Sequence, residues 1–299
     1  MRIYSTKPVW GLRHRWHSCA GNLRRKRRVA TQQRRGKMII AVSNQKGGVA
    51  KTTTCLALGA TLAGSGSRVL IIDCDAQANL TMGLGIDPND VQQSHSQLYL
   101  DPYCDIHNVI RDTGYFDGRL HVVPAELDLA VVEKQLHNQP NFELLLQRQL
   151  DRLETPYDFV FCDCPPSLGV LTLNALSAAD LVIIPIACEY YAVGGLNQIL
   201  SIVDLVRRNT NPMLQYRLLV TMHDKRLRMS QLVYSQVQAN FESALFDTYI
   251  GIDCKIKESQ AEGIPINQYA PHTRSTVQYE LLAEEIATFA APAEPVAIG

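Results

Sequence analysis

The chain has 299 residues, of which 46% are hydrophobic and 19% charged. This composition is that of a globular protein with a large core, and it excludes collagen-like, coiled-coil and wholly disordered chains. The basic and acidic side chains are equal in number, at 29 each, but residues 1–37 carry twelve of the basic ones and none of the acidic ones. The other 262 residues therefore hold 17 basic and 29 acidic side chains, a net charge of −12.

Residues 1–37 form a basic extension that we expect to be disordered, because a run such as Arg24–Arg28 repels itself and lacks an apolar period. Three interpretations stay open for it. Translation could begin at Met38, the segment could be an arm that neutralises nucleic-acid phosphates, or it could be an organelle transit peptide. We expect a flexible tail at 291–299, which contains two prolines and no basic residue.

From residue 38 onward, segments with strand and helix patterns alternate, with a looser stretch at 85–118. Strands are expected at 38–43, 69–73, 120–123, 157–163, 181–187, 218–222 and 245–250, and helices at 52–63, 127–136, 142–153, 170–178, 196–207, 231–241 and 277–289. This alternation predicts an α/β fold over residues 38–290, with a doubly wound, mostly parallel sheet and helices on both faces. In such sheets, ligands bind beyond the carboxyl ends of the strands.

The loop after the first strand has the composition of a phosphate-binding loop. Its glycines allow several N–H groups to face one anion, at the N-terminus of the following helix. Lys51 can reach the terminal phosphates, and the Thr52 hydroxyl can ligate Mg²⁺. The usual G-x-x-x-x-G-K-[ST] pattern is not matched, because Gln45 and Ala50 occupy its glycine positions. The predicted nucleotide-binding residues are Lys46, Gly47, Gly48, Val49, Ala50, Lys51, Thr52 and Thr53.

Acidic residues end two of the predicted strands. The strand at 69–73 runs into Asp73-Cys74-Asp75, and the strand at 157–163 ends at Asp163 before Cys164 and two prolines. A carboxylate in the position of Asp163 holds magnesium in phosphate-binding folds. Cys162 and Cys164 point away from the Asp163 face, so we expect them to be buried apolar residues.

Residues 44–54 resemble the deviant Walker A loop of the ParA-type partition ATPases, within the MinD/ParA/nitrogenase-iron-protein class of P-loop NTPases. The resemblance extends over about 38–289 and includes the segments at 73–81 and 157–169. It implies a slow, partner-stimulated ATP hydrolase that uses ATP and Mg²⁺. In it, Lys46 would contact the phosphates of a second subunit in an ATP-sandwich homodimer, and Lys51 would bind those of its own.

The same resemblance implies that Asp75 activates the attacking water and that Asp73 supports the magnesium shell beside Thr52 and Asp163. The catalytic residues would be Lys46, Lys51 and Asp75. Six positions depart from the family pattern: Ala50, Ala76, Gly194, and Gly251, Ile252 and Asp253, where the family usually has Pro, Arg and Asn. We expect the Ala50 methyl to be tolerated only if the backbone there keeps a negative φ. Asn174 is expected at the dimer interface or the nucleotide.

Family members also carry basic residues for sequence-independent DNA binding, for which phosphate contacts suffice. The matching positions here are Arg226, Arg228, Lys255, Lys257 and Arg274. The resemblance therefore implies a cytoplasmic, nucleoid-associated protein that partitions chromosome or plasmid DNA with a ParB-like centromere-binding partner. A ParA-like positioner of a protein cargo stays open as an alternative.

Two other functions receive less support. A MinD-like cell-division ATPase needs a basic amphipathic C-terminal helix, which the 290–299 tail lacks, so no membrane partner is expected. An amidoligase would need a glutaminase-like domain, for which no segment is apparent. The eight cysteines form no C-x-x-C pair, so reduced thiols in a cytosolic protein are expected.

Overall fold

The computed structural model describes residues 37–290 apart from 102, 137–138 and 190–191, so the basic extension and the C-terminal tail lie outside the described residues. A seven-stranded sheet with the order β3-β4-β2-β5-β1-β6-β7 forms its centre. The strands are β1 (Met38–Val42), β2 (Val69–Asp73), β3 (Arg111–Asp112), β4 (Leu120–Val123), β5 (Phe159–Asp163), β6 (Leu181–Ala187) and β7 (Gln215–Thr221). The predicted fold class, doubly wound and mostly parallel, is confirmed.

All neighbouring strands pair in parallel except β3, a two-residue strand that runs antiparallel to β4 at one edge. The three strands that lead into the predicted site lie side by side. Asp163 at the end of β5 is level with Val42 of β1 on one side and with Asp73 of β2 on the other. The phosphate-loop strand and the two carboxylate strands therefore end at the same edge of the sheet.

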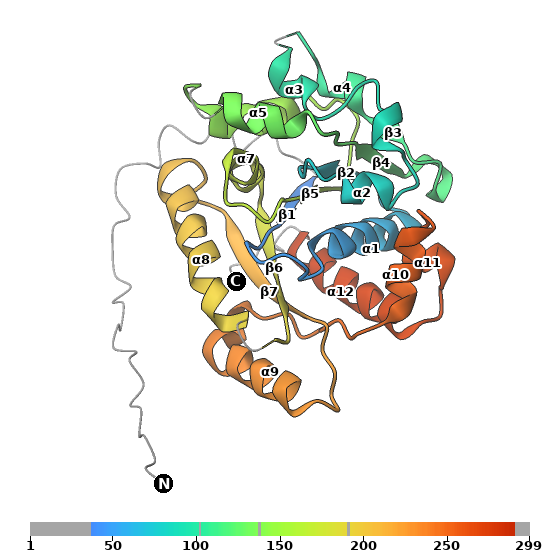
Figure 1. The fold of residues 1–299 in the computed structure, drawn as a ribbon, viewed down its shortest axis with the longest axis vertical. Helices are drawn as coiled ribbons and strands as arrows, with labels where there is room; N and C mark the ends of the chain where they lie inside the picture. Colours follow the sequence, from blue (N-terminus) through green and yellow to red (C-terminus); the bar gives the residue numbers. More distant parts are fainter. Residues whose placement is uncertain (1–36, 102, 137–138, 190–191, 291–299) are drawn as a thin grey trace, which may run out of the picture. The chain divides into compact units, whose positions relative to one another are not determined.

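Longer helices cover both faces of the sheet (Figure 1). Side chains alternate along each buried strand, so that Ile39 and Ala41 of β1 join one core cluster while Ile40 and Val42 join the other. The first cluster includes α6 (Leu145–Asp151), α7 (Val170–Ala178), α8 (Ala192–Asn209) and α9 (Arg228–Phe241), and the second includes α1 (Lys51–Gly64) and α12 (Arg274–Ala290). Helix α5 (Leu129–Leu136) contributes to a third, smaller cluster.

The remaining elements are short. The helices are α2 (Asn79–Met82), α3 (Gln97–Leu100), α4 (Ile106–Val109), α10 (Cys254–Ala261) and α11 (Ile266–Tyr269), and the 3-10 turns are η1 (Pro88–Asp90), η2 (Phe116–Gly118), η3 (Phe142–Leu144) and η4 (Glu242–Ala244). Of these, α3, α4, η1 and η2 fall in the stretch 85–118, where the sequence pattern is loose. No described helix is long and apolar enough to cross a membrane.

The strand predicted at 245–250 is wrong. The chain there makes only isolated bridges, from Leu245 to Leu218 and from Gly251 to His223. Between them the backbone leaves the sheet, because the N–H groups of Asp247 and Thr248 donate to the Glu285 carboxylate of α12 instead of to a strand. This segment therefore runs along the end of β7 as a loop, which leads directly into the site.

Candidate nucleotide-binding cleft

A cleft of about 1260 Å³ opens beyond the carboxyl ends of the central strands. Its lining combines the loop before α1 with segments from six other parts of the chain. These lining residues include Gly47, Gly48, Ala50, Lys51, Thr52, Thr53, Asp75, Gln77, Glu133, Pro165, Ser167, Thr221, Met222, Gly251, Ile252, Asp253, Lys257 and Gln260. The predicted loop residues thus share the cleft with the segment around Asp75 and with a wall formed by residues of 250–261.

The phosphate loop is wound by two residues with left-handed backbone angles. Gly48 has φ +72°, and Ala50, the residue before α1, has φ 68° and ψ 34°. The expectation of a negative φ at Ala50 is therefore wrong. The reason is that the loop must reverse just before the helix, and an alanine accepts this conformation at a cost of about 1–2 kcal/mol. The first helical turn then closes with Thr54 N–H donating to the Ala50 carbonyl at 2.9 Å.

The two lysines of the loop have different surroundings. Lys51 lies in the cleft with 8% of its surface exposed, and burial lowers its pKa while the nearby Asp163 carboxylate opposes the shift. Lys46 instead forms an ion pair with Glu189, which follows β6, and does not line the cleft formed by the described residues. Both partners of that pair are partly exposed, so its net stabilisation is at most about 1 kcal/mol.

Asp163 and Thr52 meet the requirements of a magnesium site. The Thr52 hydroxyl donates to Oδ2 of Asp163 at 2.6 Å. Oδ1 of the same carboxylate is buried and accepts no hydrogen bond from any described residue. Burial, together with the charge of Asp73, raises the pKa of Asp163 well above its ordinary value. A hard divalent cation would supply the missing partner for Oδ1 and neutralise the buried carboxylates, so the residues fit Mg²⁺.

Asp73 is fully buried and serves its own loop. Its Oδ2 accepts hydrogen bonds from the N–H and hydroxyl of Thr81 at 2.9 and 2.7 Å, and its Oδ1 accepts the Asp75 N–H at 3.1 Å. These bonds orient Asp75, which lines the cleft. Burial raises the pKa of Asp73 to about 6 despite the three hydrogen bonds. Support of the magnesium shell by Asp73 stays a prediction.

A buried histidine, His95, forms a hydrogen bond with the backbone at the start of the same loop. His95 Nδ1 lies 2.8 Å from the Asp73 carbonyl, and its Nε2 lies 3.0 Å from the Tyr99 hydroxyl. Because the carbonyl only accepts, Nδ1 carries the proton and Nε2 accepts from the tyrosine. Burial lowers the pKa of His95 to about 4, so the neutral ring is the form that the fold requires.

We expect His95→Gln to change how stability depends on pH. Since the pKa of His95 is lowered on folding, its contribution is present above pH 6.5 and is lost as the pH falls through about 4. Asp73, with its raised pKa, contributes in the opposite sense, as its stabilisation is lost when the pH rises through about 6. The free energy of unfolding should therefore fall less on acidification in the variant, by on the order of 3 kcal/mol between pH 7 and pH 4. Urea unfolding at both pH values measures this, and parallel pH profiles for the two proteins would contradict it.

The five predicted DNA-binding residues have different surroundings. Arg226 makes a two-pronged ion pair with Asp224, at 3.0 and 2.8 Å, and Lys255 pairs with Glu258 at 2.6 Å. Lys257 lines the nucleotide cleft and makes no ion pair with a described residue. Arg274 donates to the Ile252 carbonyl, also at the cleft. Arg228, the fifth, is an exposed residue at the start of α9.

Several residues at the cleft were not found by sequence reasoning. Glu133 of α5 lines it from the side opposite α10, and Gly169 leaves room for its carboxylate. No local pattern marks Glu133, because its position depends on the packing of α5 against α7. Asn174 lies elsewhere than expected. Its amide is buried and binds the Val170 carbonyl and the Leu146 N–H, so it joins α6 to α7. Cys162 and Cys164 are buried, as predicted.

Comparisons with known proteins agree with this geometry. Residues 37–216 match the AAA_31 family, described as an AAA domain. The chain is 42% identical to the sporulation initiation inhibitor protein Soj of Bacillus subtilis, over 83% of this chain and 98% of that one. It is 39% identical to the chromosome partitioning protein ParA of Myxococcus xanthus, over 86% of this chain and 90% of that one. Among solved structures, a cobyrinic acid a,c-diamide synthase from Mycobacterium smegmatis with bound ADP and magnesium has a TM-score of 0.72 and 35% identity, over 84% of this chain and 94% of that one.

The phosphate loop at a helix N-terminus, beside a carboxylate that ends the neighbouring strand, defines a P-loop ATPase. More narrowly, the chain belongs to the AAA_31 family and to the Soj/ParA chromosome-partitioning ATPases within it. Its cofactors are ATP and Mg²⁺, and its reaction is ATP hydrolysis. In this reaction Lys51 would neutralise phosphate charge, and Thr52 and Asp163 would hold the metal, which would supply further charge neutralisation at the phosphates.

Proposed function

We propose that this ATPase partitions chromosome or plasmid DNA by forming an ATP-sandwich homodimer that binds DNA without sequence preference. The observation that carries the proposal is the placement of Lys46. Its ammonium group pairs with Glu189 outside the cleft of its own subunit. Lys51 is the lysine of this loop that lines the cleft. A second phosphate-loop lysine directed away from its own nucleotide fits a cation that acts on a neighbouring subunit's nucleotide.

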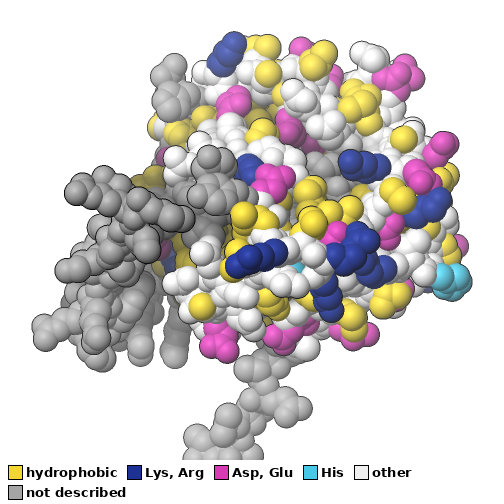
Figure 2. All heavy atoms as spheres, turned by 60° about the horizontal axis from the view of Figure 1, so that its bottom comes forward, with side chains coloured by type: hydrophobic (Ala, Val, Ile, Leu, Met, Phe, Trp, Pro, Cys, Tyr) yellow, Lys and Arg dark blue, Asp and Glu magenta, His cyan; other side chains and the backbone are white. Residues whose placement is uncertain are grey.

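The surface at the α9 end supports DNA binding in the dimer. Figure 2 shows Lys and Arg side chains gathered near the middle of this face, with acidic side chains around its rim. Arg226, Arg228 and Lys255 are exposed, although two of them are paired with carboxylates. A body with net charge −12 repels DNA at a distance, but this repulsion is screened beyond about 8–10 Å at physiological salt. Two copies of the patch in one dimer would double the local positive charge and favour contact with phosphates.

The proposed protein works in the cytoplasm on the nucleoid, with a ParB-like centromere-binding protein that raises its ATP turnover. The relatives named above as Soj and ParA support this assignment. The basic segment 1–37, where it is present, would add twelve positive charges per subunit to the same task.

Lys46→Ala tests the proposal, because it removes the cross-subunit cation and leaves Lys51 in place. We expect the variant to bind ATP within about twofold of the parent protein, yet to remain monomeric with ATP and Mg²⁺, and so to bind DNA at least tenfold more weakly. Light scattering after size exclusion, and fluorescence anisotropy with two unrelated DNA duplexes, provide the measurements. Glu189→Gln is the matched control, since it breaks the same ion pair but keeps the lysine.

The proposal also predicts strong salt dependence of DNA binding, because phosphate contacts release counterions. Anisotropy titrations between 50 and 200 mM salt, about a fourfold range, should show a steep loss of affinity with ATP. A Lys46→Ala protein that dimerises normally, or equal DNA binding with and without ATP, would overturn the proposal.

A further inference from the structure

The loop at 250–253 forms one wall of the cleft, and it is fastened from three sides. The Ile250 carbonyl accepts the His223 N–H at 3.0 Å. The Gly251 N–H donates to the Gln278 side chain of α12 at 2.9 Å. Asp253 caps α10 by accepting the Lys255 N–H, and its other oxygen accepts the Ser275 hydroxyl at 2.9 Å. Because Gly251, Ile252 and Asp253 all line the cleft, the position of this loop sets the shape of that part of the cleft.

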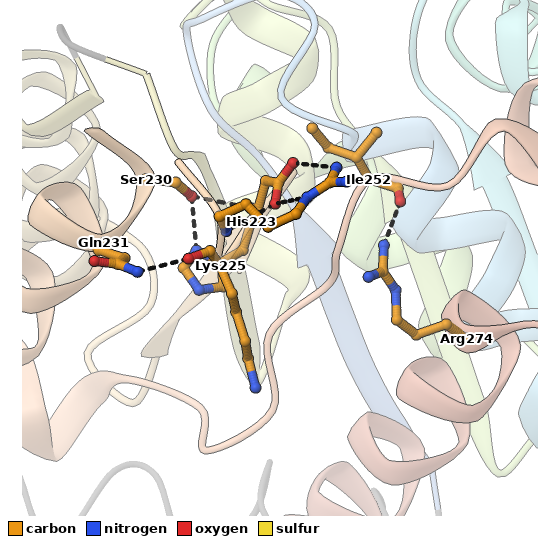
Figure 3. Close-up of polar contacts among 8 residues, drawn as sticks. His223, Lys225, Ser230, Gln231, Ile252 and Arg274 are labelled. Carbon is orange, nitrogen blue, oxygen red and sulfur yellow. Dashed lines mark hydrogen bonds and ion pairs between the residues drawn. The ribbon is translucent and has the colours of Figure 1, made fainter. Parts of the chain in front are cut away.

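Arg274 adds a contact of a different kind. Its guanidinium donates from Nη2 to the Ile252 carbonyl, and Figure 3 shows the side chain pointing from the start of α12 to that carbonyl. The guanidinium also lies flat against Gly251. A Cβ at residue 251 would stand 2.9 Å from Nη2, 3.0 Å from Cζ and 3.2 Å from Nε. Side chains rarely approach this closely, so a Cβ at residue 251 would make the guanidinium shift from this position.

We infer that Arg274 is a positioning residue for the nucleotide, which fixes this wall of the cleft through Ile252 and Gly251. The family resemblance gives Arg274 a DNA contact, and it gives position 251 a proline. The structure places these two residues in contact with each other. A proline at 251 carries a Cβ and would displace the guanidinium, whereas the glycine of this chain admits it.

The geometry specifies what Arg274 does for the ligand. The loop before α1 and the wall at 250–253 line the same cleft, so a nucleotide whose phosphates bind that loop would meet this wall with its base or ribose. The Ile252 carbonyl is bonded to Arg274, and Gly251 is covered by the guanidinium. The backbone at 251–253 is therefore held in one conformation. A wall that is already held in one position loses less conformational entropy when the ligand binds, which is the general basis of preorganisation. Arg274 thus acts on nucleotide affinity and not on the chemical step.

The experiment is a double-mutant cycle between Arg274→Ala and Gly251→Ala in the full chain. Gly251 has a φ outside the left-handed region, so alanine suits its backbone, and the new Cβ meets only the movable end of Arg274. Titration with a fluorescent ATP analogue and Mg²⁺ gives the dissociation constant, and steady-state hydrolysis gives KM and kcat. We expect each single variant to weaken nucleotide binding about 3- to 10-fold with kcat within about twofold. The double variant should be no weaker than Arg274→Ala, because both changes remove one contact.

Arg228→Ala is the matched control, since Arg228 is also an exposed arginine at a helix start but lies away from the cleft lining. We expect it to leave the dissociation constant for the nucleotide unchanged. A thermal unfolding midpoint within about 2 °C of the parent protein in all variants excludes general destabilisation. Unchanged nucleotide affinity in Arg274→Ala, or additive losses in the double variant, would overturn the inference.

A DNA arm rests on the proposed function and separates the two roles of the arginines. At saturating ATP and Mg²⁺, Arg274→Ala should bind DNA like the parent protein, whereas Arg226→Ala should bind it more weakly. A loss of DNA binding by Arg274→Ala at unchanged nucleotide affinity assigns Arg274 to the DNA surface and overturns the inference. If no variant and not even the parent protein bound DNA, the proposed function would fail, while the nucleotide titrations would still decide the role of Arg274.

Discussion

Replacing Lys51 with alanine is expected to abolish ATP binding and hydrolysis. Lys51 is the lysine of the phosphate loop that lies inside the cleft, 8% exposed, in line with the first turn of α1. The buried Asp163 carboxylate acts on the charge of Lys51, and Asp73 lies close enough to act on Asp163. Without Lys51, the added negative charge of ATP would meet these acids with one cation fewer, and electrostatic contacts are strong in a desolvated site. We expect turnover to fall by about 100-fold or more.

Isothermal titration with ATP and Mg²⁺, together with a phosphate-release assay, measures this effect. Lys134→Ala, which changes an exposed lysine of α5, is the control for loss of a positive charge without a cleft contact. Burial lowers the pKa of Lys51, so its removal should not destabilise the unliganded fold. Retained nucleotide affinity in Lys51→Ala would contradict the placement of the phosphates on this loop.

The Asp75→Ala variant is expected to bind ATP but not to hydrolyse it at an appreciable rate. The Asp75 carboxylate lines the cleft, and its backbone is fixed by the Asp73 hydrogen bond, while its Oδ1 accepts the Gln77 N–H at 3.0 Å. This position suits a group that orients or deprotonates the attacking water, a role that contributes about 10²- to 10⁴-fold to rate. Removing it should lower turnover by about 100-fold or more and leave nucleotide affinity unchanged.

If the sandwich dimer forms as proposed, the same variant should accumulate it. Sizing with and without ATP and Mg²⁺ would show a dimer that persists for much longer than that of the parent protein, since hydrolysis no longer ends it. Asp75→Asn serves as a matched variant that keeps the Gln77 contact but cannot accept a proton. Undiminished hydrolysis in both variants would remove Asp75 from the mechanism.

The parallel strands could be predicted from sequence because each is a short, continuous apolar run. The ranges 69–73, 120–123 and 181–187 agree with β2, β4 and β6 residue for residue. Strands buried on both faces carry this signal without help from their neighbours. The range 245–250 lacks such a run, because Asp247 and Thr248 interrupt its apolar residues, and it forms a loop. Its backbone partners come from the Glu285 side chain, 35 or more residues away in sequence, and no local pattern encodes such a partner.

The candidate site divides in the same way. The loop at 46–53 and the carboxylate Asp163 were predicted from residue types, since the loop lies between a strand and a helix that the pattern reveals and Asp163 ends another such strand. The left-handed conformation of Ala50 was not, because its neighbours override the preference of an alanine for negative φ. Glu133, His95 and the contact of Arg274 with Gly251 depend on which segments pack together, and the sequence shows them only as isolated residues.

The sequence by itself determined the order of strands and helices, the phosphate loop with its two lysines, and the carboxylates that accompany it. These features are written in short runs of residues whose chemistry is local, so reading the chain in order is enough to find them. Only the tertiary structure decided that Lys46 pairs with Glu189 outside the cleft, that Asp73 holds the loop of Asp75 through Thr81, and that Arg226, Lys255 and Arg274 each bind a different partner. Those outcomes depend on distances between segments far apart in the chain, which are fixed when the two hydrophobic layers pack against the sheet.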